Sequence, residues 1–118
     1  MNYISRAIYT DRRMATRFDG RGLMANVGGV LVDVLDISIG GAKVARRIAP
    51  PTKVTVIVLY RRDGNRIDLN GAVSVTGSVV HADAAAIHFR FETATFALSK
   101  LIVAHASKQL GVAPYSVR

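Results

Sequence analysis

The chain has 118 residues, half of them hydrophobic, and a formal net charge of +8, which predicts one domain over residues 1–118 with a core of its own. The absence of cysteine excludes a disulfide framework and any zinc site built from thiolates. No apolar stretch is long enough for a secretory signal or a membrane span, so we expect a cytoplasmic protein.

Residues 1–21 are expected to form a flexible arm that is rich in arginine. Arginine outnumbers lysine twelve to four in the chain, and five of the arginines lie in this arm: Arg6, Arg12, Arg13, Arg17 and Arg21. A guanidinium group binds phosphate or a guanine edge through paired hydrogen bonds, whereas a lysine offers only a point charge. Charge alone is also typical of general solubility, or of loose attraction to nucleic acid or anionic lipid.

Residues 22–91 carry the alternation of apolar and polar residues that is typical of half-buried strands. In "AIHFRFE", for example, Ile87, Phe89 and Phe91 point one way, and His88 and the other polar residues point the opposite way. Turn-forming stretches such as "VGG" and "RDGN" separate six such segments. The predicted strands span residues 22–27, 30–37, 41–48, 53–60, 66–80 and 85–91. Short strands at this spacing favour antiparallel pairing, and a six-stranded barrel would leave no exposed edge.

Residues 93–110 differ from the rest because they lack glycine and proline and end at Gly111, a typical helix stop. Phe96, Val103 and Leu110 recur every seven residues and predict an apolar stripe, which Leu98, Leu101 and Ile102 widen. We therefore expect an all-β barrel with one C-terminal helix that packs against it. A homodimer formed through this helix is the alternative.

No constellation typical of an enzyme is present. Without cysteine, the candidate nucleophiles are serines, and none of them lies in a nucleophile elbow. His81 and Asp83 could meet, but two ligands do not make a metal site and no third is evident. The sequence therefore predicts a protein without catalytic residues, metal or cofactor.

A pair of arginines in the arm is a better candidate for a site. Arg13 and Arg17 are four residues apart in the stretch "RRMATR", and both can contact the same object whether this stretch is helical or a loop. An anion between them would relieve the repulsion of their like charges. A solvated basic patch is the alternative, since this spacing is common by chance.

The stretch "DISIGG", residues 36–41, is the second candidate. If the strand alternation continues, Leu35, Ile37 and Ile39 face inward, while Asp36 and Ser38 emerge on the same outer side. Asp36 can accept the N–H groups of a guanine edge, and the Ser38 hydroxyl can donate and accept.

Gly40 and Gly41 follow, and they would allow a left-handed turn and the close approach of a flat ring. The alternative is a tight hairpin with an Asx-type turn and no ligand.

Together the two stretches resemble the signature of the PilZ domain family, RxxxR followed by [D/N]xSxxG. The halves here read "RMATR" and "DISIGG", and eighteen residues separate Arg17 from Asp36, somewhat fewer than is usual in the family. The resemblance extends from about Asp11 to Glu92. It implies a six-stranded barrel that binds cyclic di-GMP, a bacterial second messenger, and acts in signal transduction.

The ligand-binding residues implied by the resemblance are Arg12, Arg13, Arg17, Asp36, Ser38, Gly40 and Gly41. The arm would hold guanine and phosphate, because arginine pairs with the O6 and N7 acceptors of guanine and with phosphate oxygens. A basic residue at position 12 further implies that the ligand is taken up as a stacked pair of molecules. A single domain of this kind needs a protein effector to deliver its output.

Two other functions stay open at this level. The first is an adaptor that keeps the fold, binds no nucleotide and acts through protein contacts. The second is a basic barrel that binds single-stranded nucleic acid, although such proteins present stacked aromatic residues on their surface, whereas Phe89 and Phe91 are expected to point inward. We therefore expect no specific binding of nucleic acid.

Overall fold

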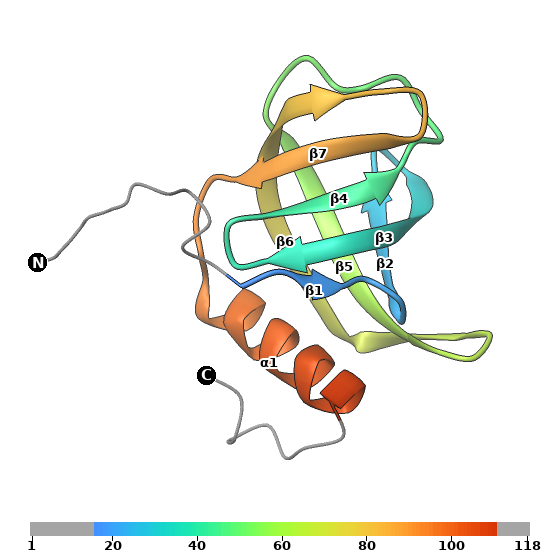
Figure 1. Cartoon of the computed structure of the whole chain (residues 1–118), viewed down its shortest axis with the longest axis vertical. Coiled ribbons are helices and arrows are strands. Elements are labelled where there is room, and N and C mark those ends of the chain that lie inside the picture. Colours follow the sequence, from blue (N-terminus) through green and yellow to red (C-terminus); the bar gives the residue numbers. More distant parts are fainter. Residues whose placement is uncertain (1–15, 111–118) are drawn as a thin grey trace, which may run out of the picture.

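The computed structural model describes residues 16–110 of the chain (Figure 1). Within this part the chain forms seven strands and one helix. In chain order these are β1 (Phe18–Asp19), β2 (Leu23–Val27), β3 (Val30–Ser38), β4 (Gly41–Ala45), β5 (Thr55–Asp63), β6 (Arg66–Ala82), β7 (Ala86–Phe91) and α1 (Phe96–Leu110).

Six of the strands close into an antiparallel barrel in the order β3-β2-β5-β6-β7-β4, and the pairing of β3 with β4 completes the circle. Side chains from all six strands fill the interior, and Leu23, Ile37, Ile57, Leu59 and Ile87 are among the largest that are fully buried. The predicted six-stranded barrel with one C-terminal helix is therefore confirmed. Each of the six predicted strands overlaps an observed one.

The turn between β2 and β3 shows why the local sequence was informative. Val27 and Val30 pair across it, which leaves Gly28 and Gly29 as a two-residue loop with φ angles of 61° and 89°. A loop in which both residues have positive φ matches the right-handed twist of the strands that it joins, and glycine adopts such angles without strain.

Strand β1 was not predicted. Phe18 and Asp19 pair with Ile37 and Asp36 near the end of β3. They lie on the same side of β3 as β2, which pairs with the first half of that strand. Between β1 and β2 the chain passes very close to β3, because a Cβ atom on Gly20 would lie 2.2 Å from the carbonyl oxygen of Val34. Only glycine fits at this point. Residues 18–20, which were expected to belong to the flexible arm, therefore lie against the barrel.

Strand β3 contains an irregularity that changes which side chains face the core. Its register with β4 shifts between Val34 and Asp36, and such a bulge moves the following residues to the opposite face. Val34 and Ile37 are buried, while Leu35 is exposed. The prediction that Leu35 faces inward was therefore wrong, and the prediction for Ile37 was correct.

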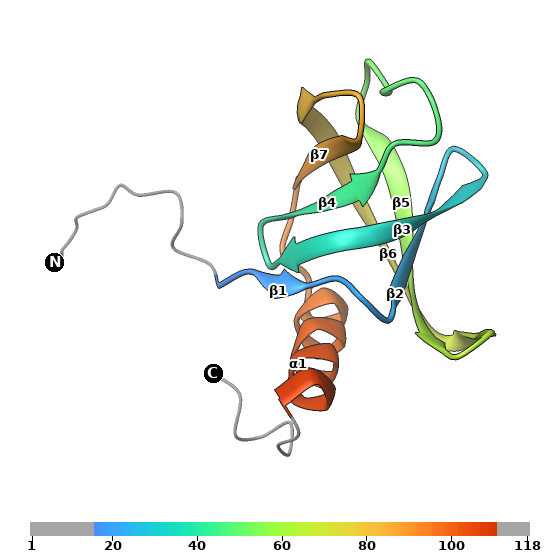
Figure 2. The ribbon, with the colours of Figure 1, turned by 45° about the vertical axis from the view of Figure 1, so that its right-hand side comes forward.

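Helix α1 lies across one end of the barrel, next to β1 (Figures 1 and 2). The Thr95 hydroxyl accepts the N–H of Leu98 at 3.1 Å and caps the first turn. Leu98, Leu101 and Ile102 are buried, but Phe96 is 79% exposed, so the seven-residue stripe through Phe96 is not the packed face. Within residues 16–110, no helix combines the length and the apolar character needed to cross a bilayer.

Two side chains of α1 bind the backbone of β1. Nε2 of His105 lies 2.6 Å from the carbonyl oxygen of Asp19, and Nε2 of Gln109 donates to the same oxygen at 2.8 Å. Because a carbonyl only accepts, Nε2 of His105 carries the proton. His105 is buried, so this bond lies in the interface between the helix and the barrel.

Candidate functional site

The structure brings together Arg17 and Asp36, one residue from each of the two predicted stretches. Arg17 immediately precedes β1, and the pairing of Asp19 with Asp36 carries it alongside β3. Nη1 of Arg17 donates to Oδ1 of Asp36 in an ion pair. The Arg17 side chain is 49% exposed and that of Asp36 is 29% exposed, so both can be reached from solvent. Arg12 and Arg13 lie outside the described residues.

Ser38 has a different role from the one predicted. It is only 4% exposed, its hydroxyl oxygen accepts the N–H of Gly40 at 3.2 Å, and it donates to the carbonyl of Gly41 at 3.5 Å. Ser38 and Gly41 pair across the turn, so the hydroxyl stabilises the two-residue loop between β3 and β4. The expectation that Ser38 emerges at the surface was wrong, because its polar atoms are satisfied inside the hairpin.

Gly41 is needed for packing, not for a left-handed turn. Positive φ angles occur at Gly22, Gly28, Gly29 and Gly64 among the described glycines, so the predicted left-handed geometry at Gly40 and Gly41 was wrong. A Cβ atom on Gly41 would lie 2.2 Å from the carbonyl oxygen of Phe89. This close approach lets β4 pair with β7.

Gly40 is exposed and has open space beside it. The nearest atom to a Cβ built there would be the Ser38 hydroxyl oxygen at 3.9 Å, an ordinary van der Waals contact. The backbone of Gly40, which no side chain covers, therefore lies at the surface two residues after Ser38. A flat ring could approach it.

Two further cations share the outer face with this pair. Lys43 of β4 stands opposite Asp36 of β3 in the register, and directly opposite side chains on one face lie about 5 Å apart at Cβ. Arg90 of β7 stands opposite Gly41 and is exposed. Asp36 thus has Lys43 opposite it on β4 and Asp19 opposite it on β1, while Arg90 lies two strands away from it on the same face.

Sequence reasoning did not single out Lys43 and Arg90. The alternation of β4 and β7 indicates that both point outward, but only the register between strands places Lys43 opposite Asp36 and Arg90 opposite Gly41. The Asp36–Lys43 pairing follows from the two-residue turn between β3 and β4. The pairing that places Arg90 joins β4 to β7, which is remote in the sequence, so it could not be derived.

The carboxylate of Asp19 in β1 is bound by Arg21, two residues later in the chain. Oδ1 of Asp19 accepts the backbone N–H of Arg21 at 2.8 Å, and the Arg21 side chain lies 3.1 Å from Oδ2. The backbone hydrogen bond from Arg21, reinforced by its side chain, lowers the pKa of Asp19 below its usual value. Asp19 is thereby held as a carboxylate two residues after Arg17.

Comparison with known proteins bears on the fold. No model of a known protein family matches the chain, and no curated protein matches it. The structure is similar to the crystal structure of the Legionella uncharacterized protein Lpg0364, with a TM-score of 0.58 and 18% sequence identity over 81% of this chain and 96% of that one. At this identity the likeness concerns the fold alone.

Proposed function

We propose that this protein is a receptor for cyclic di-GMP that passes the signal to a protein effector. The observation that carries the proposal is the contact between Arg17 and Asp36. These residues belong to the two separate halves of the signature that the sequence resembles, and they meet on one exposed face of a six-stranded barrel.

The chemistry of this pair suits a guanine nucleotide. The guanidinium group of Arg17 has five N–H donors, and its bond to Asp36 leaves others free to pair with guanine O6 and N7 or with a phosphate. Asp36 holds the guanidinium in place before the ligand arrives, which lowers the entropy cost of binding. The second oxygen of Asp36 can accept the N–H groups of a guanine edge.

The surroundings of the pair suit the rest of a cyclic dinucleotide. Lys43 adds positive charge opposite Asp36, and Arg90 adds it two strands away on the same face; the two phosphodiesters of the ligand carry two negative charges. Gly40 presents open main chain on the same side of the turn. Ser38 would act indirectly, by holding the turn that positions Gly40.

A route for the signal runs from Arg17 to α1. Arg17 is two residues from Asp19, whose carbonyl oxygen is bound by His105 and Gln109 of the helix. A ligand that pulls Arg17 toward a phosphate would strain these bonds, so the position of α1 depends on the state of the arm. The exposed Phe96 at the start of α1 offers an apolar contact for an effector.

Binding of single-stranded nucleic acid has less support. Phe89 and Phe91 are buried in the barrel, and residues in that position cannot stack on bases. Charge remains the main feature in favour of this function, and charge is not specific.

Calorimetric titration with cyclic di-GMP, with GTP and cyclic di-AMP as controls, tests the proposal. We expect saturable binding of cyclic di-GMP and much weaker binding of the controls. Amide NMR of the same sample should shift at Gly40 and at residues next to Asp36. The absence of any heat or shift with cyclic di-GMP would reject the proposal and favour the nucleotide-free adaptor, and binding of a generic oligonucleotide instead would favour the nucleic-acid alternative.

A further inference from the structure

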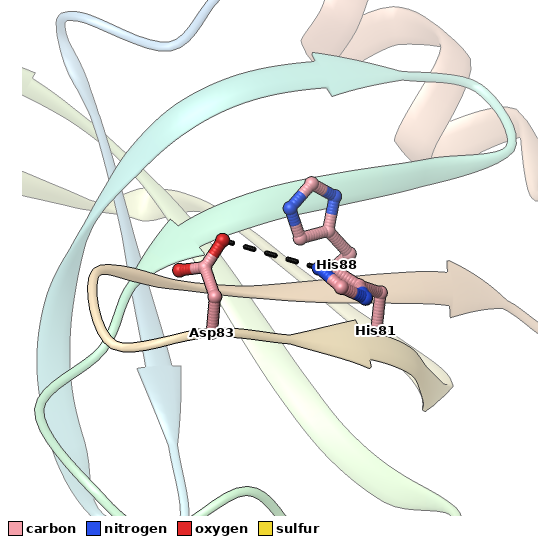
Figure 3. A group of neighbouring side chains, drawn as sticks. All are labelled: His81, Asp83 and His88. Carbon is pink, nitrogen blue, oxygen red and sulfur yellow. Dashed lines mark ion pairs between the residues drawn. The ribbon is translucent and has the colours of Figure 1, made fainter.

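A second group of polar side chains lies on the hairpin formed by β6 and β7 (Figure 3). His81 of β6 stands directly opposite His88 of β7, and their ring centroids are 5.2 Å apart with the planes at 72°. Asp83 lies at the start of the turn between the strands, and its Oδ2 is 3.9 Å from Nε2 of His81. One nitrogen or oxygen of each residue lies within 4.8 Å of the others.

The backbone of the turn fixes the carboxylate of Asp83. Its Oδ1 accepts the N–H groups of Ala85 at 2.8 Å and Ala86 at 2.9 Å, while Oδ2 is the oxygen that lies near His81. Arg46 adds a bond from Nη1 to the carbonyl of Asp83 at 2.9 Å. Outer hydrogen bonds of this kind orient a ligand before an ion arrives and strengthen metal binding.

We propose that His81, Asp83 and His88 form a binding site for a divalent transition-metal ion such as Zn²⁺. Two imidazoles and one carboxylate suit ions of borderline softness, whereas Mg²⁺ and Ca²⁺ prefer sites made of oxygen alone. Ligand atoms on a tetrahedral zinc ion with bonds of about 2.0–2.2 Å lie roughly 3.4 Å apart. Small rotations of the side chains close the remaining distance.

Exposure decides the character of the site. The side chains of His81 and Asp83 are 63% and 54% exposed, so an ion reaches them directly from solvent. Three protein ligands leave at least one coordination position for water or for an anionic group from another molecule. The site is therefore open, unlike the closed four-ligand sites that are typical of structural zinc.

The register also places this site relative to the Arg17–Asp36 pair. Asp36, Lys43, His88 and His81 stand opposite one another in turn across β3, β4, β7 and β6. His88 is thus two strand spacings, about 10 Å, from Asp36. Lys43 lies between them, and its charge opposes an incoming cation.

Titration of the full chain with Zn²⁺ in a non-chelating buffer tests the site. We expect one equivalent to bind, with changes in the ¹⁵N shifts of the His81 and His88 rings. His88→Ala should abolish this binding, and Asp83→Asn should weaken it by about tenfold or more, because the amide keeps an acceptor for the turn but loses the charge.

Asp68→Asn is the matched control. Asp68 is an exposed aspartate whose Oδ1 also accepts two backbone N–H groups, from Asn70 and Gly71, so this change should leave Zn²⁺ binding as in the unaltered protein. Lys43→Met should tighten binding by roughly three- to tenfold, as removal of a neighbouring positive charge predicts at a screened surface.

The proposal would be overturned if His88→Ala, with its fold confirmed by circular dichroism, kept the Zn²⁺ affinity of the unaltered protein and the same Zn²⁺-induced change in the ¹⁵N shifts of the His81 ring. A loss of affinity in Asp68→Asn equal to that in Asp83→Asn would also overturn it. The test does not involve a nucleotide, so it stands apart from the receptor function.

Discussion

Replacing Arg17 with alanine tests the candidate site most directly. The change removes the ion pair with Asp36 and the donors that would reach guanine or phosphate. A hydrogen bond to a charged group contributes about 1.5–3 kcal/mol, and each 1.4 kcal/mol is about tenfold in affinity. We therefore expect binding of cyclic di-GMP, measured by calorimetry, to weaken by roughly ten- to a hundredfold.

Stability should respond far less than affinity. The Arg17–Asp36 pair is partly exposed to solvent, and such pairs contribute about 0–1 kcal/mol to folding. Urea unfolding of Arg17→Ala should therefore give a free energy of unfolding within about 1 kcal/mol of the unaltered protein. This separates a loss of ligand contacts from a loss of structure.

Arg62→Ala supplies a matched control. Arg62 is also a partly exposed arginine on the barrel, and its Nη1 lies 3.9 Å from Oδ1 of Asp33. Both variants lose one positive charge, so a general effect of charge would weaken binding equally in the two. Equal affinities of Arg17→Ala, Arg62→Ala and the unaltered protein would remove Arg17 from the site.

Three further predictions concern the turn and β1. Gly41→Ala should destabilise the fold by about 3 kcal/mol, because its Cβ would meet the carbonyl oxygen of Phe89; an unchanged urea midpoint would contradict this. Gly40→Ala should change stability by less than about 0.5 kcal/mol but weaken cyclic di-GMP binding in calorimetry, since a methyl group there faces open space that the ligand would use; unaltered affinity would exclude contact at Gly40. The lowered pKa of Asp19 adds stability that is present above its unfolded pKa of about 3.9 and is lost as pH falls through the lower folded value. The stability difference between the unaltered protein and Asp19→Asn should therefore shrink with acid in urea unfolding, and a difference independent of pH would refute it.

The barrel could be predicted because its signals are local. Alternation marks each strand, and glycine pairs such as Gly28–Gly29 mark the reversals, so neither requires knowledge of distant residues. Strand β1 is only two residues long and carries no period. It exists because β3 lies beside it and α1 binds its backbone, and both partners are remote in the sequence.

The candidate site was predicted only in part, because some of its features depend on contacts between residues that are remote in the sequence. The resemblance of the two stretches to one family signature implied that Arg17 and Asp36 share a ligand, and the structure places the two residues in contact. The bulge near Leu35 reverses the faces of β3, and no residue type announces it. Ser38 is buried because its hydroxyl bonds within the hairpin. The row from Asp36 through Lys43 to His88 depends on the pairing of β4 with β7, which a single sequence does not reveal.

The binding of the Asp19 carbonyl by His105 and Gln109 also sets an order of assembly during synthesis. The first strand is made early, but the side chains that hold it are among the last of the described residues to be translated. A nascent chain that still lacks α1 therefore lacks the two side-chain contacts of the helix to β1. Under the proposed receptor function, we expect a chain without α1 to bind cyclic di-GMP more weakly than one in which α1 has formed.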